Sequence, residues 1–163
     1  MDRKEIKIWV RGEPAPKGSY KGTGKGAMPA GSAINRDKLA SWTGAVRTAA
    51  AAAMAAAGYP DRLMFINEPL MIHVLFYMAR PRKHFVVKGE FAGAVRGDAP
   101  KYHISKPDGS KLLRSTEDDL TGIVFDDDSR IAISGHKKLY AEPGREGAWI
   151  SISRLVDDDG AKR

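Results

Sequence analysis

The sequence predicts a single domain of the α/β (α+β) class, with a mixed β-sheet, two main helices and long basic loops. Three observations lead to this prediction. Ile6, Ile8 and Val10 occupy alternate positions, as in a half-buried strand. Apolar residues recur at helical spacing between residues 35 and 57, and residues 70–78 are almost continuously apolar. The latter run predicts a central strand buried on both faces.

Length and composition restrict the class of protein. A chain of 163 residues with 42% hydrophobic content can bury one core, so we expect one domain over residues 1–156 and a disordered tail over residues 157–163. No apolar run reaches the length of a membrane span, and no signal-peptide block follows Met1, which predicts a cytoplasmic protein. The absence of cysteine excludes disulfides, thiolate metal sites and a cysteine nucleophile.

The charge balance indicates an anionic partner. The chain has 27 Lys and Arg against 20 Asp and Glu, a formal net charge of +7. Such an excess suits nucleic acid better than a membrane surface, because no membrane segment accompanies it. A Gly-, Pro- and Lys-rich stretch over residues 12–33 is either a flexible cationic arm that follows phosphates or a plain surface loop.

The first helix is expected to start at Asn35 or Asp37, which can cap it, and to end before Gly58 and Pro60. A second basic stretch follows the central strand, over residues 80–106. Phe85, Phe91 and Tyr102 are interleaved with its cations. They either stack on unpaired bases or anchor the loop, and we favour a nucleic-acid surface.

Acidic residues surround the predicted second helix, which follows Asp108 and ends at Gly122. Residues 123–125 are expected to form a strand, with Asp126 to Asp128 at its end. Carboxylates packed together in a basic protein would repel a polyanion unless a cation lay between them, and oxygen ligands suit Mg²⁺ or Mn²⁺. The pattern therefore favours a metal-dependent enzyme acting on a nucleic-acid backbone, although a run of three Asp is also common in solvated turns.

Two basic or titratable groups complete the candidate site. Arg114 can stabilise charge on a phosphate, although an Arg at position i with Asp118 at i+4 is also a common surface ion pair. Residues 131–139 predict an edge strand, on which His136 is either a proton-transfer partner or a surface residue. The expected phosphate contacts are Lys17, Lys21, Lys25, Arg82, Lys83, Lys106, Lys111, Lys137 and Lys138.

Two segments carry a resemblance to a known family. Lys106-Pro107-Asp108-Gly109-Ser110-Lys111-Leu112-Leu113-Arg114 and Asp118-Asp119-Leu120-Thr121-Gly122, followed by Asp126-Asp127-Asp128, resemble the core signature of RusA-type Holliday junction resolvases. That signature runs roughly Lys-Pro-Asp-x-Asp-Asn-Leu-x-Lys, Asp-Ala-Leu-x-Gly and Asp-Asp-x-x-Val. The opening loop after Gly12 is also similar to that of the family.

The resemblance implies a homodimeric, magnesium-dependent endonuclease, typically encoded by a phage or prophage, that nicks two opposed strands of a four-way DNA junction. Asp108 and Asp128 match the family's first and last catalytic aspartates, and Asp127 stands beside Asp128, so these three are the implied metal ligands. Arg114 takes the place of a required lysine. Asp118 matches a supporting acid.

The chain departs from the family pattern at Ser110, where the second aspartate is expected, and at Lys111, where an asparagine is expected. A hydroxyl is a weaker ligand for Mg²⁺ than a carboxylate, which predicts weaker metal binding unless Asp118, Asp126 or Asp127 replaces the charge. Asp119 replaces a small residue and lies either near the site or on the surface. The alternative function is a catalytically weakened or inactive protein that binds DNA junctions or single strands.

Overall fold

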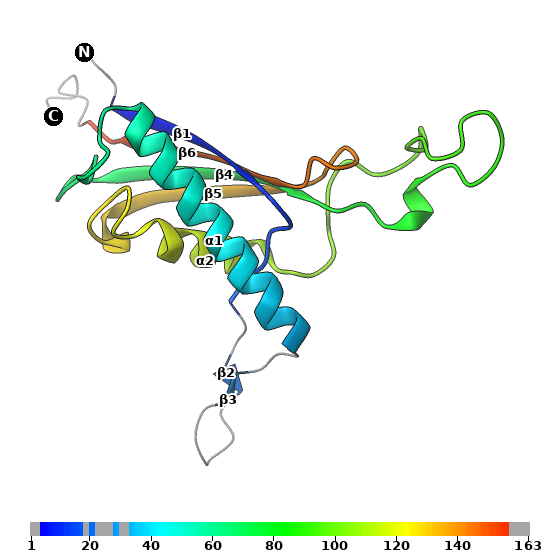
Figure 1. The fold of residues 1–163 in the computed structure, drawn as a ribbon, viewed down its shortest axis with the longest axis horizontal. Coiled ribbons are helices and arrows are strands. Elements are labelled where there is room, and N and C mark those ends of the chain that lie inside the picture. The colour runs from blue at the N-terminus through cyan, green and yellow to red at the C-terminus, as the bar shows by residue number, and fades with distance from the viewer. Residues whose placement is uncertain (1–3, 18–19, 22–27, 30–32, 157–163) are drawn as a thin grey trace, which may run out of the picture.

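The computed structural model describes residues 4–17, 20–21, 28–29 and 33–156, and its main feature is a four-stranded sheet (Figure 1). The strand order is β1-β6-β4-β5, and β4 and β5 are parallel while the other neighbours are antiparallel. This mixed sheet and two long helices confirm the predicted fold class. The elements are β1 Glu5–Arg11, β2 Tyr20–Lys21, β3 Met28–Pro29, α1 Ala33–Ala56, β4 Leu70–Met78, η1 Arg82–His84, α2 Gly109–Leu120, η2 Asp128–Arg130, β5 Ile131–Tyr140 and β6 Gly147–Arg154.

The core lies between one face of the sheet and the two helices. Alternate residues of β1, β4 and β6 point into it, among them Ile8, Ile72 and Ile150, each at most 1% exposed. Trp42 and Val46 from α1 are equally buried. Because strand side chains alternate between the faces, the same register places Ser134 and His136 of β5 on the helix side of the sheet.

The other face of the sheet is not covered within the described residues. Trp9 and Trp149 lie there side by side, each 39% exposed, with ring centroids 6.3 Å apart, and Tyr77 packs edge-on against Trp9. The prediction that β4 is buried on both faces is therefore wrong. His73 of this strand is exposed rather than part of the core.

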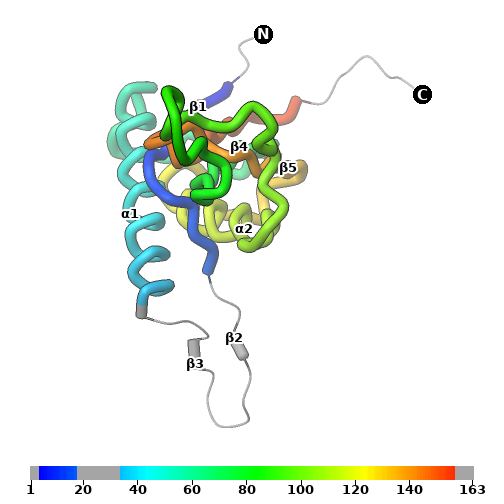
Figure 2. Tube along the Cα trace, turned by 90° about the vertical axis from the view of Figure 1, so that its right-hand side faces the viewer, coloured from blue at the N-terminus to red at the C-terminus, as the bar shows by residue number. Residues whose placement is uncertain are grey.

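Three local expectations differ from the structure. The predicted strand over residues 123–125 is a turn held by isolated bridges from Phe125 to Phe65 and Thr121, because the chain reverses at Gly122 (φ 79°). Helix α1 begins at Ala33, so Asn35 lies inside it. The Gly-rich arm contains the two-residue strands β2 and β3, which lie beyond the N-terminal end of α1 (Figure 2).

A hairpin projects from the sheet after β4 (Figure 1). Backbone hydrogen bonds join Arg96 N to His84 O and Val86 N to Ala94 O, at 2.9 and 2.8 Å. We call residues 84–96 the projecting hairpin. Phe91 at its tip is 70% exposed. No helix in the described part of the chain is long and apolar enough to cross a membrane.

Candidate active site

Helix α2 separates the core from the candidate site. Leu112 and Leu120 are fully buried on its inner side. Asp108, in an extended conformation (φ −66°, ψ 136°), is the residue that precedes the first turn of the helix. The burial of one side fixes the rotation of the helix and therefore the direction of its polar side chains.

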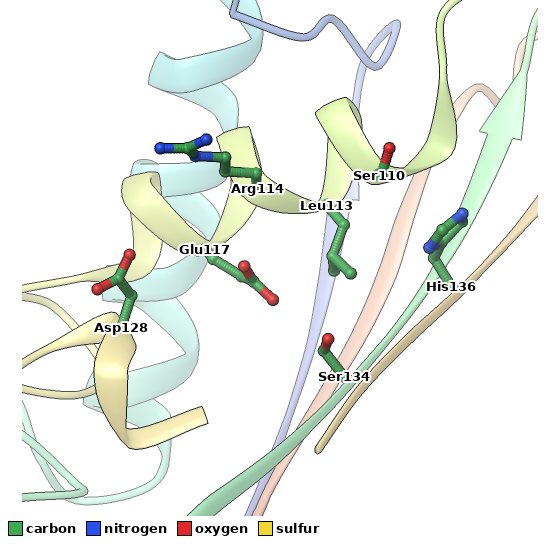
Figure 3. Close-up of a pocket in the computed structure, with 7 residues that line it drawn as sticks. All are labelled: Ser110, Leu113, Arg114, Glu117, Asp128, Ser134 and His136. Carbon is green, nitrogen blue, oxygen red and sulfur yellow. The ribbon is translucent and has the colours of Figure 1, made fainter. Parts of the chain in front are cut away.

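The polar side of α2 faces β5 and η2 across an open pocket of about 600 Å³ (Figure 3). Ser110, Arg114 and Glu117 are four and three residues apart, so helical geometry places them on one face. Asp128 enters the pocket from η2. The lining residues are Ser110, Leu113, Arg114, Glu117, Asp128, Ser134 and His136.

The structure distinguishes the three consecutive aspartates. Asp126 forms an ion pair with Arg130 at 3.1 Å, and Asp127 accepts a hydrogen bond from Ser129 N at 2.8 Å and so caps η2. The Arg130 guanidinium lowers the pKa of Asp126, and the Ser129 hydrogen bonds lower that of Asp127. Of the three, Asp128 is the one that lines the pocket, and which of them binds a metal stays a prediction.

Asp108 lies at the start of α2 and outside the set of pocket-lining residues. Its carboxylate forms an ion pair with Lys111 Nζ at 3.1 Å. The segment before it is held by Lys138, whose Nζ donates to the carbonyl oxygens of Ser105 and Pro107, both at 2.7 Å. Lys138, expected as a phosphate contact, therefore also connects β5 to the start of α2.

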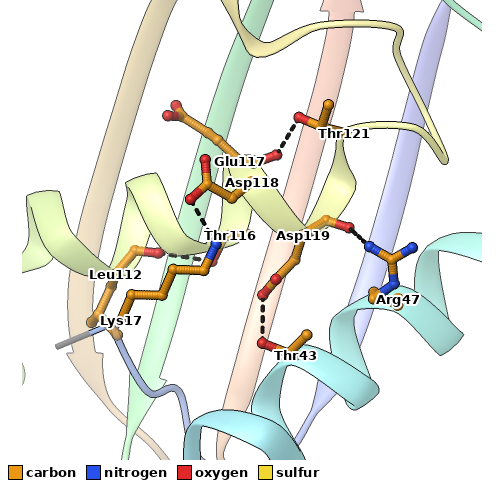
Figure 4. A network of polar contacts seen from close by, with 9 residues as sticks. All are labelled: Lys17, Thr43, Arg47, Leu112, Thr116, Glu117, Asp118, Asp119 and Thr121. Atoms are coloured by element: carbon orange, nitrogen blue, oxygen red, sulfur yellow. Dashed lines mark hydrogen bonds and ion pairs between the residues drawn. The ribbon is translucent and has the colours of Figure 1, made fainter. Parts of the chain in front are cut away.

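The other acids of α2 have different surroundings (Figure 4). Asp118 is paired with Lys17 at 2.7 Å, which joins the Gly-rich arm to α2. Asp119 is only 4% exposed and accepts a hydrogen bond from Thr43 at 3.1 Å, so it belongs to the contact between α1 and α2 and neither approaches the site nor lies on the surface. Burial raises the pKa of Asp119.

Glu117 points from α2 into the pocket, between Asp128 and Ser134 (Figure 3). Its pKa is raised to about 6, first by burial and then by the negative charges of Asp128 and Asp118; Arg114 opposes the shift. Sequence reasoning missed this residue. The spacing of Ser110, Arg114 and Glu117 is the signal that would have found it.

The donor chemistry of the pocket suits a hard divalent cation. Glu117 and Asp128 supply carboxylate oxygens and Ser110 a hydroxyl, which are the ligand types of Mg²⁺ and Mn²⁺. Within residues 4–17, 20–21, 28–29 and 33–156, no group of three His, Asp or Glu side chains is arranged to hold a metal ion. The expected ligands Asp108, Asp127 and Asp128 are thus not assembled here, and their role stays a prediction.

The predicted phosphate contacts fall into three groups. Lys17, Lys111 and Lys138 have protein partners. Lys25 and the side chain of Lys21 lie outside the described residues. The remaining four predicted contacts are exposed and form no ion pair with another described residue: Arg82, Lys83, Lys106 and Lys137.

Gly109 gives a first test of the site's geometry. It is buried at the start of α2, and a Cβ at this position would overlap Nε2 of His136. We expect Gly109→Ala to displace the imidazole and, because Ala also favours the helix, to change the free energy of unfolding in urea by no more than about 1 kcal/mol. In a His136→Ala background the same change should be more favourable to stability. Equal effects in both backgrounds would contradict the packing described here.

Glu117 gives a second test, in the metal-free protein with a chelator present. Its folded-state pKa of about 6 lies above the unfolded value of 4.5, so the stability it contributes is present below pH 4.5 and is lost as pH rises through 6. Glu117→Gln stays neutral. The variant should therefore exceed the parent in stability by about 1 kcal/mol at pH 8, after allowance for solvent screening, and by little at pH 4.5. A difference independent of pH would refute this.

A family model described as endodeoxyribonuclease RusA matches residues 12–151, which begin just after β1 and include both helices, β4, β5, the first part of β6 and the whole pocket. None of the curated proteins compared with the chain matches it. The match covers most of the sequence and is consistent with the mixed α+β fold. The chain belongs to the RusA family of endodeoxyribonucleases, enzymes that act on branched DNA junctions.

Proposed function

We propose that this protein is a divalent-metal-dependent endonuclease that resolves Holliday junctions, or other branched DNA, by nicking two opposed strands. The observation that carries the proposal is the pocket in which Arg114 and Asp128, from separate parts of the family signature, line the same space beside α2. A guanidinium and a carboxylate at one site supply the two functions that phosphodiester hydrolysis needs, anion stabilisation and metal binding.

Mg²⁺ or Mn²⁺ is the proposed cofactor, with Asp108, Asp127 and Asp128 as candidate ligands. When bound, such an ion activates water and neutralises charge on the scissile phosphate. Asp128 has the strongest support, because it lines the pocket. Asp108 and Asp127 flank α2 and η2, and Asp108 would have to exchange its ion pair with Lys111 for a metal contact.

The protein's own groups have separable roles in this proposal. Arg114 binds the phosphate oxygens on the polar side of α2. Lys138 is a positioning residue, since its two hydrogen bonds to the 105–107 backbone locate Asp108. Asp118 acts through Lys17, which it holds beside α2 at 2.7 Å, so its support of the site is indirect.

DNA binding is assigned to the exposed cations and to the projecting hairpin. Arg82, Lys83, Lys106 and Lys137 are available for phosphates. The hairpin also presents Phe91, 70% exposed, at its tip. An exposed aromatic ring beside cations suits stacking on the unpaired bases at a branch point, where bases are more accessible than in a duplex.

A homodimer is proposed because a four-way junction needs two cuts and the family signature provides one site per chain. A twofold arrangement places two equivalent pockets on one junction. The uncovered sheet face with Trp9 and Trp149 is an apolar surface suited to a second copy of this chain.

One observation favours a second candidate function, a catalytically weakened or inactive junction-binding protein. Ser110 lines the pocket where the family signature has an aspartate, so the site lacks one expected carboxylate. The basic surfaces would serve binding alone equally well. Cleavage, and not binding, therefore discriminates between the two functions.

The decisive measurement is nicking of a synthetic four-way junction with Mg²⁺ or Mn²⁺. The parent protein should cut two opposed strands, and Asp128→Asn should lower the rate by about 100-fold or more while junction affinity stays within a few fold, because the lost carboxylate serves chemistry and not DNA attraction. Glu142→Gln, at an exposed turn, is the control. A parent protein that binds junctions but cuts none of them would support the second function.

The hairpin is tested by Phe91→Ala. Loss of one stacked base should weaken junction binding by about fivefold or more at fixed salt, measured by fluorescence anisotropy. Val156→Ala removes a comparably exposed apolar side chain (56%) just after β6 and should leave affinity unchanged. Equal affinities for the two variants would remove Phe91 from the DNA surface.

A further inference from the structure

The acidic side chains around α2 and η2 differ in whether they already have an ion-pair or hydrogen-bond partner within the protein. Asp108, Asp118 and Asp126 form ion pairs with Lys111, Lys17 and Arg130, and Asp127 and Asp119 accept hydrogen bonds from Ser129 and Thr43. Within the described part of the chain, the side chains of Glu117 and Asp128 have neither kind of partner. These two unoccupied carboxylates line the same pocket.

The positions of these carboxylates have a simple geometric origin. Ser110 and Glu117 are seven residues apart, two helical turns or about 10 Å along α2, and face the same side. Glu117 therefore does not fill the space of an aspartate at position 110. It supplies a carboxylate at the other end of the same face, next to η2, where Asp128 enters the pocket (Figure 3).

We propose that Glu117 is a metal ligand in this chain and compensates for the carboxylate that is absent at Ser110. The inference deepens the proposed function and rests on it. The cation would be held by Glu117 and Asp128, near the C-terminal half of α2, with water completing its oxygen shell. Mg²⁺ tolerates such an arrangement because it keeps several waters in protein sites.

The sequence alone offers three other acids, Asp118, Asp126 and Asp127, as replacements for the carboxylate missing at position 110, and Glu117 is not among them. Asp126 is held by Arg130 and Asp118 by Lys17, and Asp127 caps η2. Each would have to give up a protein contact to reach a metal ion. Glu117 would give up none within the described residues and already points into the pocket.

Direct metal binding tests the proposal without relying on cleavage. Free Mn²⁺ is measured by electron paramagnetic resonance during titration of the parent, Glu117→Gln, Ser110→Asp/Glu117→Gln and the control Glu142→Gln. We expect Glu117→Gln to weaken Mn²⁺ binding at least tenfold and Glu142→Gln to leave it unchanged. Adding Ser110→Asp should restore a large part of the affinity, since it returns to this pocket, which Asp128 also lines, the carboxylate that the family signature places at position 110. Thermal unfolding of each variant in a chelator verifies that it is folded.

The outcomes separate this proposal from the proposed function. If Glu117→Gln binds Mn²⁺ as the parent does, or if no protein in the series binds it, Glu117 is not a ligand. If Ser110→Asp fails to restore binding, Glu117 does not compensate for position 110. If Mn²⁺ binding depends on Glu117 but the parent cuts no four-way junction, the ligand assignment stands and the proposed function fails.

Discussion

The site depends on the packing of helix α2 against the sheet. Leu112, Thr116 and Leu120 are fully buried on one side of this helix, and their burial determines which residues face outwards. Ser110, Arg114 and Glu117 consequently face β5 and η2 and line the pocket. A rotation of the helix by one residue, about 100°, would move all three away from Asp128. Hydrophobic packing thus determines the positions of the charged groups.

Ion pairs and hydrogen bonds then determine which carboxylates remain without a partner in the protein. The chain places seven acids between positions 108 and 128, and an unpaired cluster of this size would be unfavourable without cations. Lys111, Lys17 and Arg130 each neutralise one of them. Asp119 is removed from the cluster by burial beside α1, with a hydrogen bond from Thr43. Among these seven acids, the side chains of Glu117 and Asp128 are the two without an ion-pair or hydrogen-bond partner in the described part of the chain.

The same elements link the site to the surfaces proposed for DNA. Lys138 of β5 holds the backbone before Asp108, and the adjacent Lys137 is exposed on the other side of this edge strand. Lys17 connects the Gly-rich arm to α2 through Asp118. The arm and the segment before α2 are therefore both attached to the helix that carries Arg114. Contacts with DNA at either place would act on the position of this helix.

The sequence by itself determined the fold class, the mixed sheet, both helices and the family, because period-two and period-3.6 patterns and the Lys-Pro-Asp motif are local signals. It also predicted Arg114 and Asp128 as site residues, and the fold brings both to one pocket. It failed for residues 123–125, where three apolar residues pack in a turn instead of a strand, and for the outer face of β4, since periodicity does not reveal whether a sheet face is covered. Only the tertiary structure decided which carboxylates are neutralised, because the partners of Asp118 and Asp119 lie 101 and 76 residues away along the chain. The spacing of Glu117 from Arg114 indicates which helix face it shares, but that this face lines a pocket follows from the way α2, η2 and β5 enclose one space.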